Sequence, residues 1–172
     1  MKPEEDLLAT HLMLKETVAR MRLWLDRAIH CMDQLDDVQV WYRPNAESNA
    51  IGNLVLHLVG NLKQWIIDAI GNLPDTRDRP GEFNAESGYS KMMLINLLKE
   101  TVERACKTIE AMPPIRVAET KRIQGMDVTL ANAVVMAVSH LGLHVGQIQY
   151  VGKMLLSDRY VGSSEPRERA AK

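Results

Sequence analysis

The sequence opens with a long stretch in which apolar residues recur at alternating intervals of three and four. These positions line one face of an α-helix, because a helical turn takes about 3.6 residues. The apolar positions of this face are Leu7, Leu14, Val18, Met21, Leu25, Ala28, Met32 and Leu35, and His11 falls among them. The pattern predicts a first helix over residues 4–35 that is buried along one side.

A second predicted helix covers residues 49–72 and is apolar almost all round. A loop at 36–47 precedes it, Ser48 is a candidate N-cap, and Asn-Leu-Pro-Asp at 72–75 ends it. One polar stripe interrupts the apolar surface, and its members are Asn53, His57, Asn61 and Gln64. This stripe is either the face of the helix exposed to water or the surroundings of a ligand bound at His57.

Two further helices are predicted in the second half of the chain. A polar loop at 73–89 leads to a helix over 90–112, which ends at Pro113-Pro114. Residues 119–128 alternate weakly around Gln124-Gly125, as a short hairpin or an extended connection does. The last helix covers 129–156 with Thr129 as N-cap, and its predicted apolar face holds Leu130, Ala133, Ala137, His140, His144, Gln147, Val151 and Met154.

Four helices of about 22–32 residues, each with an apolar face, predict an all-α protein built as a four-helix bundle. The connections at 36–47 and 113–128 are longer than tight hairpin loops, so the pattern leaves simple up-down-up-down topology and a crossed-over connection both open. We expect one domain over residues 1–160 and a flexible, charged tail over 161–172.

Composition narrows the classes of function. The 172 residues carry 21 Lys and Arg against 22 Asp and Glu, which argues against binding nucleic acid by neutralising phosphates. No stretch approaches the ~18 apolar residues of a membrane span, and the acidic N-terminus shows no signal peptide, so we expect a cytoplasmic protein. Two cysteines, Cys31 and Cys106, are too few for a disulfide framework and are interpreted as small core residues. The chain has 10 Met and 1 Phe, which predicts an adaptable aliphatic core with Met21, Met32, Met93 and Met112 between the helices.

His140 and His144 are the most informative pair of residues. A separation of four places both imidazoles on one helix face, about 6 Å apart along the axis, where both can bind one metal ion. An unsatisfied buried polar group costs roughly 1–3 kcal/mol, and a metal would satisfy both rings at once. The spacing alone leaves ordinary hydrogen-bonded histidines open as the alternative. Gly142 and Gly146 flank the pair and indicate close helix packing or space near the site.

The remaining three histidines are the candidates for a third ligand. His57 is the best candidate because it interrupts a helix that otherwise belongs to the core. His30 lies off the apolar face of its helix and is expected at the surface or rim. His11 lies about five turns from the level of His57, so we expect a core or end-of-bundle residue rather than a ligand.

Two segments of the sequence carry a family resemblance. Residues 49–65 read Asn-Ala-Ile-Gly-Asn-Leu-Val-Leu-His-Leu-Val-Gly-Asn-Leu-Lys-Gln-Trp, and residues 139–148 read Ser-His-Leu-Gly-Leu-His-Val-Gly-Gln-Ile. Together they resemble the DinB/YfiT-like superfamily, and Arg-Asp-Arg-Pro-Gly-Glu-Phe at 77–83 is similar to an uncharacterised branch of it. The resemblance covers about residues 5–160.

That resemblance implies a crossed-over (up-down-down-up) four-helix bundle, usually a homodimer, with a three-histidine site for a divalent metal. His57, His140 and His144 match the three ligand positions. Some members of the superfamily are transferases or isomerases that use low-molecular-weight thiols, and many have no established activity. The resemblance therefore implies a small-molecule substrate and a metal such as Zn, Ni or Fe, with a small thiol as a further cofactor.

Three histidine ligands leave a coordination position open, which is typical of catalytic sites. The leading hypothesis is a metal-dependent hydrolase or transferase, and the alternative is a non-catalytic dimeric bundle in which the metal or the histidine cluster is structural. Gln147 lies one turn after His144 and is expected behind that ligand or at the substrate. Arg77, Arg79 and Glu82 either bind substrate at the mouth of the site or form a salt-bridged structural turn.

Overall fold

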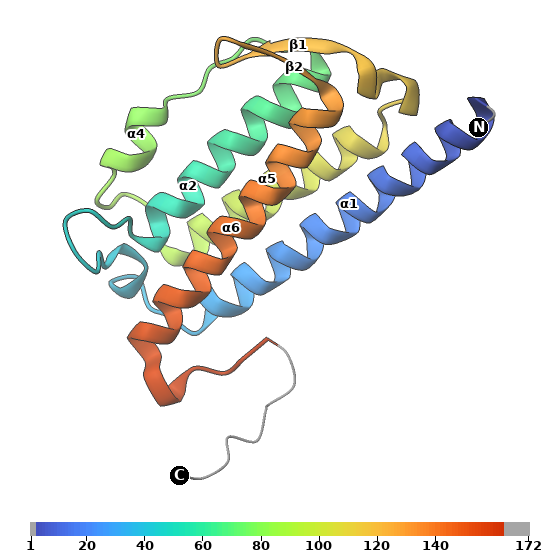
Figure 1. Cartoon of the computed structure of the whole chain (residues 1–172). Coiled ribbons are helices and arrows are strands. Elements are labelled where there is room, and N and C mark those ends of the chain that lie inside the picture. The colour runs from blue at the N-terminus through green and yellow to red at the C-terminus, as the bar shows by residue number, and fades with distance from the viewer. Residues whose placement is uncertain (1–2, 164–172) are drawn as a thin grey trace.

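Four long helical segments make up most of residues 3–163, the part of the chain that this computed structural model describes (Figure 1). They are α1 (Pro3–Asp33), α2 (Ile51–Leu62) with its continuation through the π-helical η2 (Lys63–Asp68) into α3 (Ala69–Gly71), α5 (Lys91–Glu110) and α6 (Leu130–Leu156). The shorter elements are η1 (Gln39–Trp41), α4 (Arg79–Asn84), η3 (Pro114–Ala118), η4 (Ser157–Arg159) and the antiparallel strands β1 (Thr120–Ile123) and β2 (Met126–Thr129). The prediction of a mostly helical protein is confirmed, with a small sheet in addition.

The long helices pack so that α1 and α2 each contact both α5 and α6. The beginning of α5 lies at the end of α1, where Lys91 Nζ donates to the carbonyl of Leu35 at 2.7 Å. The C-terminal halves of α1 and α6 also lie together, since the Cys31 thiol donates to the carbonyl of Ile148 at 3.5 Å. Accordingly α1 and α6 run in one direction while α2 and α5 run in the other (Figure 1).

Several predicted boundaries are confirmed by the capping contacts. Ser90 Oγ accepts from the backbone N–H of Met93 at the start of α5, and Thr129 Oγ1 accepts from that of Asn132 at the start of α6. The hairpin expected at 119–128 is the β1–β2 pair. Its turn needs left-handed backbone at Gln124 (φ 52°) and at the next residue (φ 78°), which is a glycine.

The segment around α2 departs from the prediction in three places. Ser48 is not the N-cap: α2 begins after Ala50, whose N–H donates to the side chain of Asn53 at 3.2 Å. The predicted continuous helix contains the π-helical η2. The predicted loop at 73–89 contains α4, because Asp78 caps its first turn by accepting from the N–H of Gly81 at 3.1 Å.

The buried faces differ from the predicted ones at the ends and edges of the helices. The core side of α6 holds Leu141, Val145 and Ile148, so His140 and His144 lie on its flank, half-buried. This happens because α6 packs against both α1 and α2 and therefore buries a wider arc than one row of residues. The exposed residues among those predicted to be buried are Leu7, His11, Met93, Gln147 and Met154.

The predicted tail at 161–172 lies mostly outside the described residues, which end at 163. Val161 is held in place, since its N–H donates to Gln34 Oε1 at 2.8 Å and its carbonyl accepts from Gln34 Nε2 at 3.0 Å. Within residues 3–163, none of the helices combines the length and hydropathy that a membrane span requires.

Candidate metal centre

The polar stripe of α2 faces the interior of the protein. All four residues are buried, namely Asn53, His57, Asn61 and Gln64. The chain from 77 to 85, including α4, covers this side of α2, and Asn53 Nδ2 fastens it by donating to the carbonyls of Glu82 at 3.0 Å and Ala85 at 2.7 Å. The solvated-face interpretation of the stripe is therefore wrong.

Three imidazoles converge where α2 meets α6. His57 Nε2 lies 2.8 Å from His140 Nε2, and His140 Nε2 lies 3.1 Å from His144 Nε2. One ligand atom from each residue falls within 4.8 Å of the other two. His57 is buried and the other two rings are half-buried, so the cluster lies at the edge of the core with one side toward solvent.

The outer nitrogen of two rings is fixed by an oxygen. His57 Nδ1 is 2.9 Å from Glu82 Oε2, and His144 Nδ1 is 2.6 Å from Gln147 Oε1. A carboxylate or amide oxygen can only accept, which favours the ring form in which each Nδ1 carries the proton and donates it. Arg77 Nη2, which lies 3.0 Å from His57 Nδ1, then donates to Glu82 Oε2. In a neutral ring the proton on Nδ1 leaves Nε2 as a bare lone pair, aimed at the centre of the cluster. Such a hydrogen bond behind a ligand is the usual support of a metal-binding histidine.

The protonation states suit a cation. Burial lowers the pKa of all three histidines, and burial together with the neighbouring His144 and His57 lowers that of His140 to about 4. The rings are thus neutral at pH 7, the form that binds metal. Two bare Nε2 atoms then face His140, which has at most one proton to offer. A divalent ion satisfies all three rings. The two Nε2 pairs at 2.8 and 3.1 Å need to separate by only a few tenths of an ångström to reach the ~3.3–3.4 Å spacing of tetrahedral ligands.

Arg77 and Glu82 form a buried ion pair next to the cluster. Arg77 Nε donates to Glu82 Oε1 at 2.7 Å and its terminal nitrogen donates to Oε2 at 2.8 Å, while the other terminal nitrogen donates to Gln64 Oε1 at 3.0 Å. The Arg77 and Glu82 side chains are only 4% and 8% exposed. Arg77 and Glu82 contact each other and His57 Nδ1. The two residues therefore fit the predicted salt-bridged structural turn and not a site that binds substrate. Arg79 is exposed, with its guanidinium 5.2 Å from the centre of the Phe83 ring.

The remaining histidines and both cysteines lie elsewhere. His11 is exposed near the start of α1, and His30 Nε2 is 2.9 Å from the carbonyl of Val161. Cys31 and Cys106 are fully buried as predicted, and burial raises the pKa of each thiol to about 11. Buried thiols in this state are poor nucleophiles.

Sequence reasoning missed Gly60, which allows the ion pair to lie against α2. A Cβ on Gly60 would overlap the Glu82 carboxylate and come within 3.0 Å of Arg77 Nε. The signal was present in the sequence, because Gly60 sits on the helix that carries His57 and is unfavourable there by about 1 kcal/mol relative to alanine. The glycine is explained by the space that it leaves for the ion pair between Arg77 and Glu82.

Gly60→Ala is expected to destabilise the protein or leave its free energy of unfolding unchanged, because displacing Glu82 and Arg77 offsets the gain in helix propensity. The matched control is Gly146→Ala on α6, where a Cβ meets no atom within 4 Å. That variant should gain up to about 1 kcal/mol. Urea unfolding of both proteins gives the comparison, and an equal gain in the two would show that the ion pair does not need Gly60.

A single family model matches most of the chain. Residues 9–169 match the family described as protein of unknown function DUF1572, and the chain belongs to it. Among curated proteins no match to the chain was found.

Proposed function

We propose that this DUF1572 chain is a divalent-metal protein of the DinB/YfiT-like superfamily, with His57, His140 and His144 as ligands. The proposal is carried by the convergence of three Nε2 atoms whose rings are neutral and, in two cases, anchored from behind. The helix directions support the crossed-over, up-down-down-up bundle of that superfamily. With it we propose a homodimeric, cytoplasmic protein that acts on a small molecule and not on nucleic acid or a membrane.

The residues around the ligands have distinct roles in this proposal. Glu82 accepts the Nδ1 proton of His57 and fixes the ring, and Arg77 holds Glu82 through two parallel hydrogen bonds. Gln147 does the same for His144. Both supports keep the bare nitrogens directed inward, which favours one ion position over several.

We propose further that the centre is catalytic, as a metal-dependent hydrolase or transferase. Three protein ligands leave a position for a substrate, and the half-buried faces of His140 and His144 provide the access. When bound, a divalent ion supplies a Lewis acid that lowers the pKa of a water or thiol. A low-molecular-weight thiol is the proposed co-substrate because some members of the superfamily that the chain resembles use one; the chain's own cysteines are both buried. Imidazole ligands suit Zn, Ni and Fe.

Metal content tests the first part of the proposal. Untagged protein purified without chelator and without a nickel column is expected to contain about one transition metal per chain by mass spectrometry of the elements. Removal with a chelator and titration with Zn²⁺, Ni²⁺ or Fe²⁺ should restore that ratio. Protein that is isolated metal-free and binds none of the three ions below millimolar concentration would contradict the proposal.

Turnover separates an enzyme from the alternative, a structural metal in a non-catalytic dimeric bundle. The metal-loaded protein is incubated with a panel of small thiols and electrophiles, and with ester substrates for hydrolysis. Spectra of the cobalt form report whether a coordination position exchanges ligands. A bound metal with no exchangeable position and no turnover would favour the structural role.

A further inference from the structure

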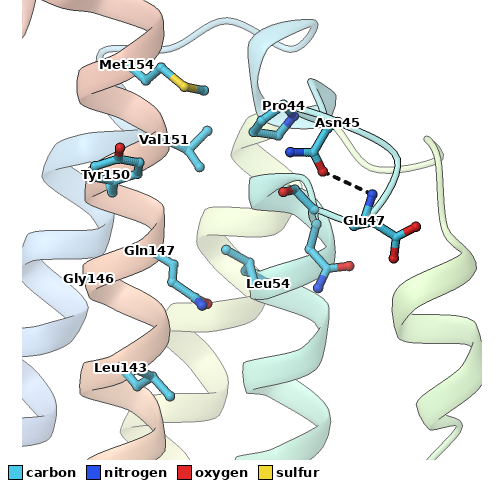
Figure 2. A pocket seen from close by; sticks show the side chains of 12 residues that line it. Pro44, Asn45, Glu47, Leu54, Leu143, Gly146, Gln147, Tyr150, Val151 and Met154 are labelled. Atoms are coloured by element: carbon cyan, nitrogen blue, oxygen red, sulfur yellow. Dashed lines mark hydrogen bonds between the residues drawn. The ribbon is translucent and has the colours of Figure 1, made fainter.

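A groove of about 740 Å³ begins one helical turn beyond the histidine cluster, between the second half of α6 and the chain at 44–54 (Figure 2). Leu54 precedes His57 by three residues on α2, and Gln147 follows His144 by three residues on α6; both line the groove. The two walls of the groove are therefore continuous with the two helices that carry the cluster. The volume is within the range of about 300–1,000 Å³ that is usual for small-molecule sites.

The walls of the groove are apolar, and its polar rim carries no basic residue. The apolar lining residues are Pro44, Leu54, Leu143, Tyr150, Val151 and Met154. Glu47 is the one charged residue among those that line the groove, and Figure 2 shows its carboxylate on the side of the loop away from α6. The lining contains no lysine or arginine, so it offers nothing to neutralise a carboxylate or phosphate.

Two side-chain amides present donors to this space from opposite walls. Gln147 Oε1 accepts from His144 Nδ1, and Asn45 Oδ1 accepts from the N–H of Glu47 at 3.0 Å. Each amide thus has its oxygen engaged and its NH₂ group available. In Figure 2 Gln147 extends from α6 toward Leu54, and the nitrogen of Asn45 is directed toward α6.

We propose that this groove binds a neutral, mainly apolar small molecule that carries a hydrogen-bond acceptor such as a carbonyl oxygen. The apolar walls bury the body of the molecule, and the NH₂ groups of Gln147 and Asn45 donate to its acceptor. That this molecule is the substrate of the metal centre rests on the proposed function and follows from Gln147, which contacts both the groove and His144. The binding itself requires no metal.

The test uses prodan, a neutral naphthalene dye with a propionyl carbonyl, in fluorescence titrations of the full chain with and without chelator. We expect saturable binding with a blue shift in both states. Gly146→Leu fills the groove from a position with no atom within 4 Å and should weaken binding at least 10-fold while the protein stays folded. Val135→Leu adds a methylene to an exposed site on α6 outside the groove and should bind as the wild type does.

Asn45→Asp keeps the oxygen that accepts from the N–H of Glu47 but removes the NH₂ donor, so it should weaken prodan binding about 3- to 10-fold. The anionic dye anilinonaphthalene sulfonate should bind more weakly than prodan. Equal binding of both dyes, or prodan binding unaffected by Gly146→Leu, would overturn the proposal. A third result would also overturn the proposal: sedimentation shows a dimer that Gly146→Leu dissociates, and prodan does not bind. A second copy of the chain would then cover the groove. Prodan binding by a protein that takes up no metal would retain the groove and reject the metal centre.

Discussion

His140→Ala is expected to abolish stoichiometric metal binding, with a loss of affinity of at least about 100-fold. The effect should exceed the 10- to 100-fold typical of losing a residue behind a ligand, because His140 is itself the central member of the cluster. Its Nε2 lies within 2.8 Å of one neighbouring Nε2 and 3.1 Å of the other. Alanine leaves two rings from two different helices, which is too few to fix an ion. Elemental analysis and metal titration followed by calorimetry measure the loss.

A stability readout makes the same prediction independent of activity. Metal at about 1,000 times its dissociation constant should raise the free energy of unfolding of the wild type by about 4 kcal/mol, and His140→Ala should lose this increase. His11→Ala is the matched control, because His11 is exposed and remote from the cluster. If the variant retains one metal per chain and the full increase in stability, His140 is not a ligand.

The local part of the site could be predicted from the sequence, because it depends on helix geometry alone. The i, i+4 spacing of His140 and His144 predicted two rings on one face, and their Nε2 atoms lie 3.1 Å apart. The helical periodicity predicted the four long helices for the same reason. The alternation at 119–128 left a hairpin and an extended connection open, and the structure has the hairpin. The helical periodicity placed the histidine pair in the middle of the buried face, whereas Leu141 and Val145 occupy that position. The sequence pattern of one helix does not indicate how many other helices pack against it, and therefore how wide its buried face is.

The long-range part of the site could not be predicted from the pattern. Whether the stripe around His57 faced water or the interior depended on what covers α2, and the cover comes from α4 and the loop before it. The sequence pattern predicted a polar loop there because α4 has only six residues, which is too short to produce a periodic pattern. The pattern made His57 the best candidate for a third ligand but left the solvated-face alternative open, and the family resemblance decided between the two. The partnership of Glu82 with His57 spans 25 residues of chain and is decided by the closure of that loop.

The same closure explains why charged residues in a predicted loop ended in the interior. The side chains of Arg77 and Glu82 are more than nine-tenths buried, and each charge is compensated by the other. A pattern of polar residues indicates exposure only where no partner is available. The neighbouring Arg79, which has no such partner, lies exposed beside Phe83.

Arg77→Met is expected to lower the free energy of unfolding by about 3–5 kcal/mol, as breaking a buried ion pair from one side does. The Glu82 carboxylate would lose the two hydrogen bonds that the guanidinium donates, and would keep the one from the N–H of His57. Methionine has similar length and fills the space, so the loss measures charge and hydrogen bonding rather than a cavity. Urea unfolding at pH 7 of the metal-free protein measures it.

Arg79→Met is the matched control in the same loop, and it should cost no more than about 1 kcal/mol, the usual contribution of an exposed cation–π contact. Replacing both partners, as Arg77→Met with Glu82→Gln, should cost less than the sum of the single changes, because no charge is then left unpaired. Metal affinity should still fall about 10- to 100-fold in the double variant, since glutamine holds the Nδ1 proton of His57 more weakly than a carboxylate does. If the loss of stability in the double variant equals the sum of the two single losses and metal affinity is unchanged, Arg77 and Glu82 do not compensate each other's charge and Glu82 does not orient His57.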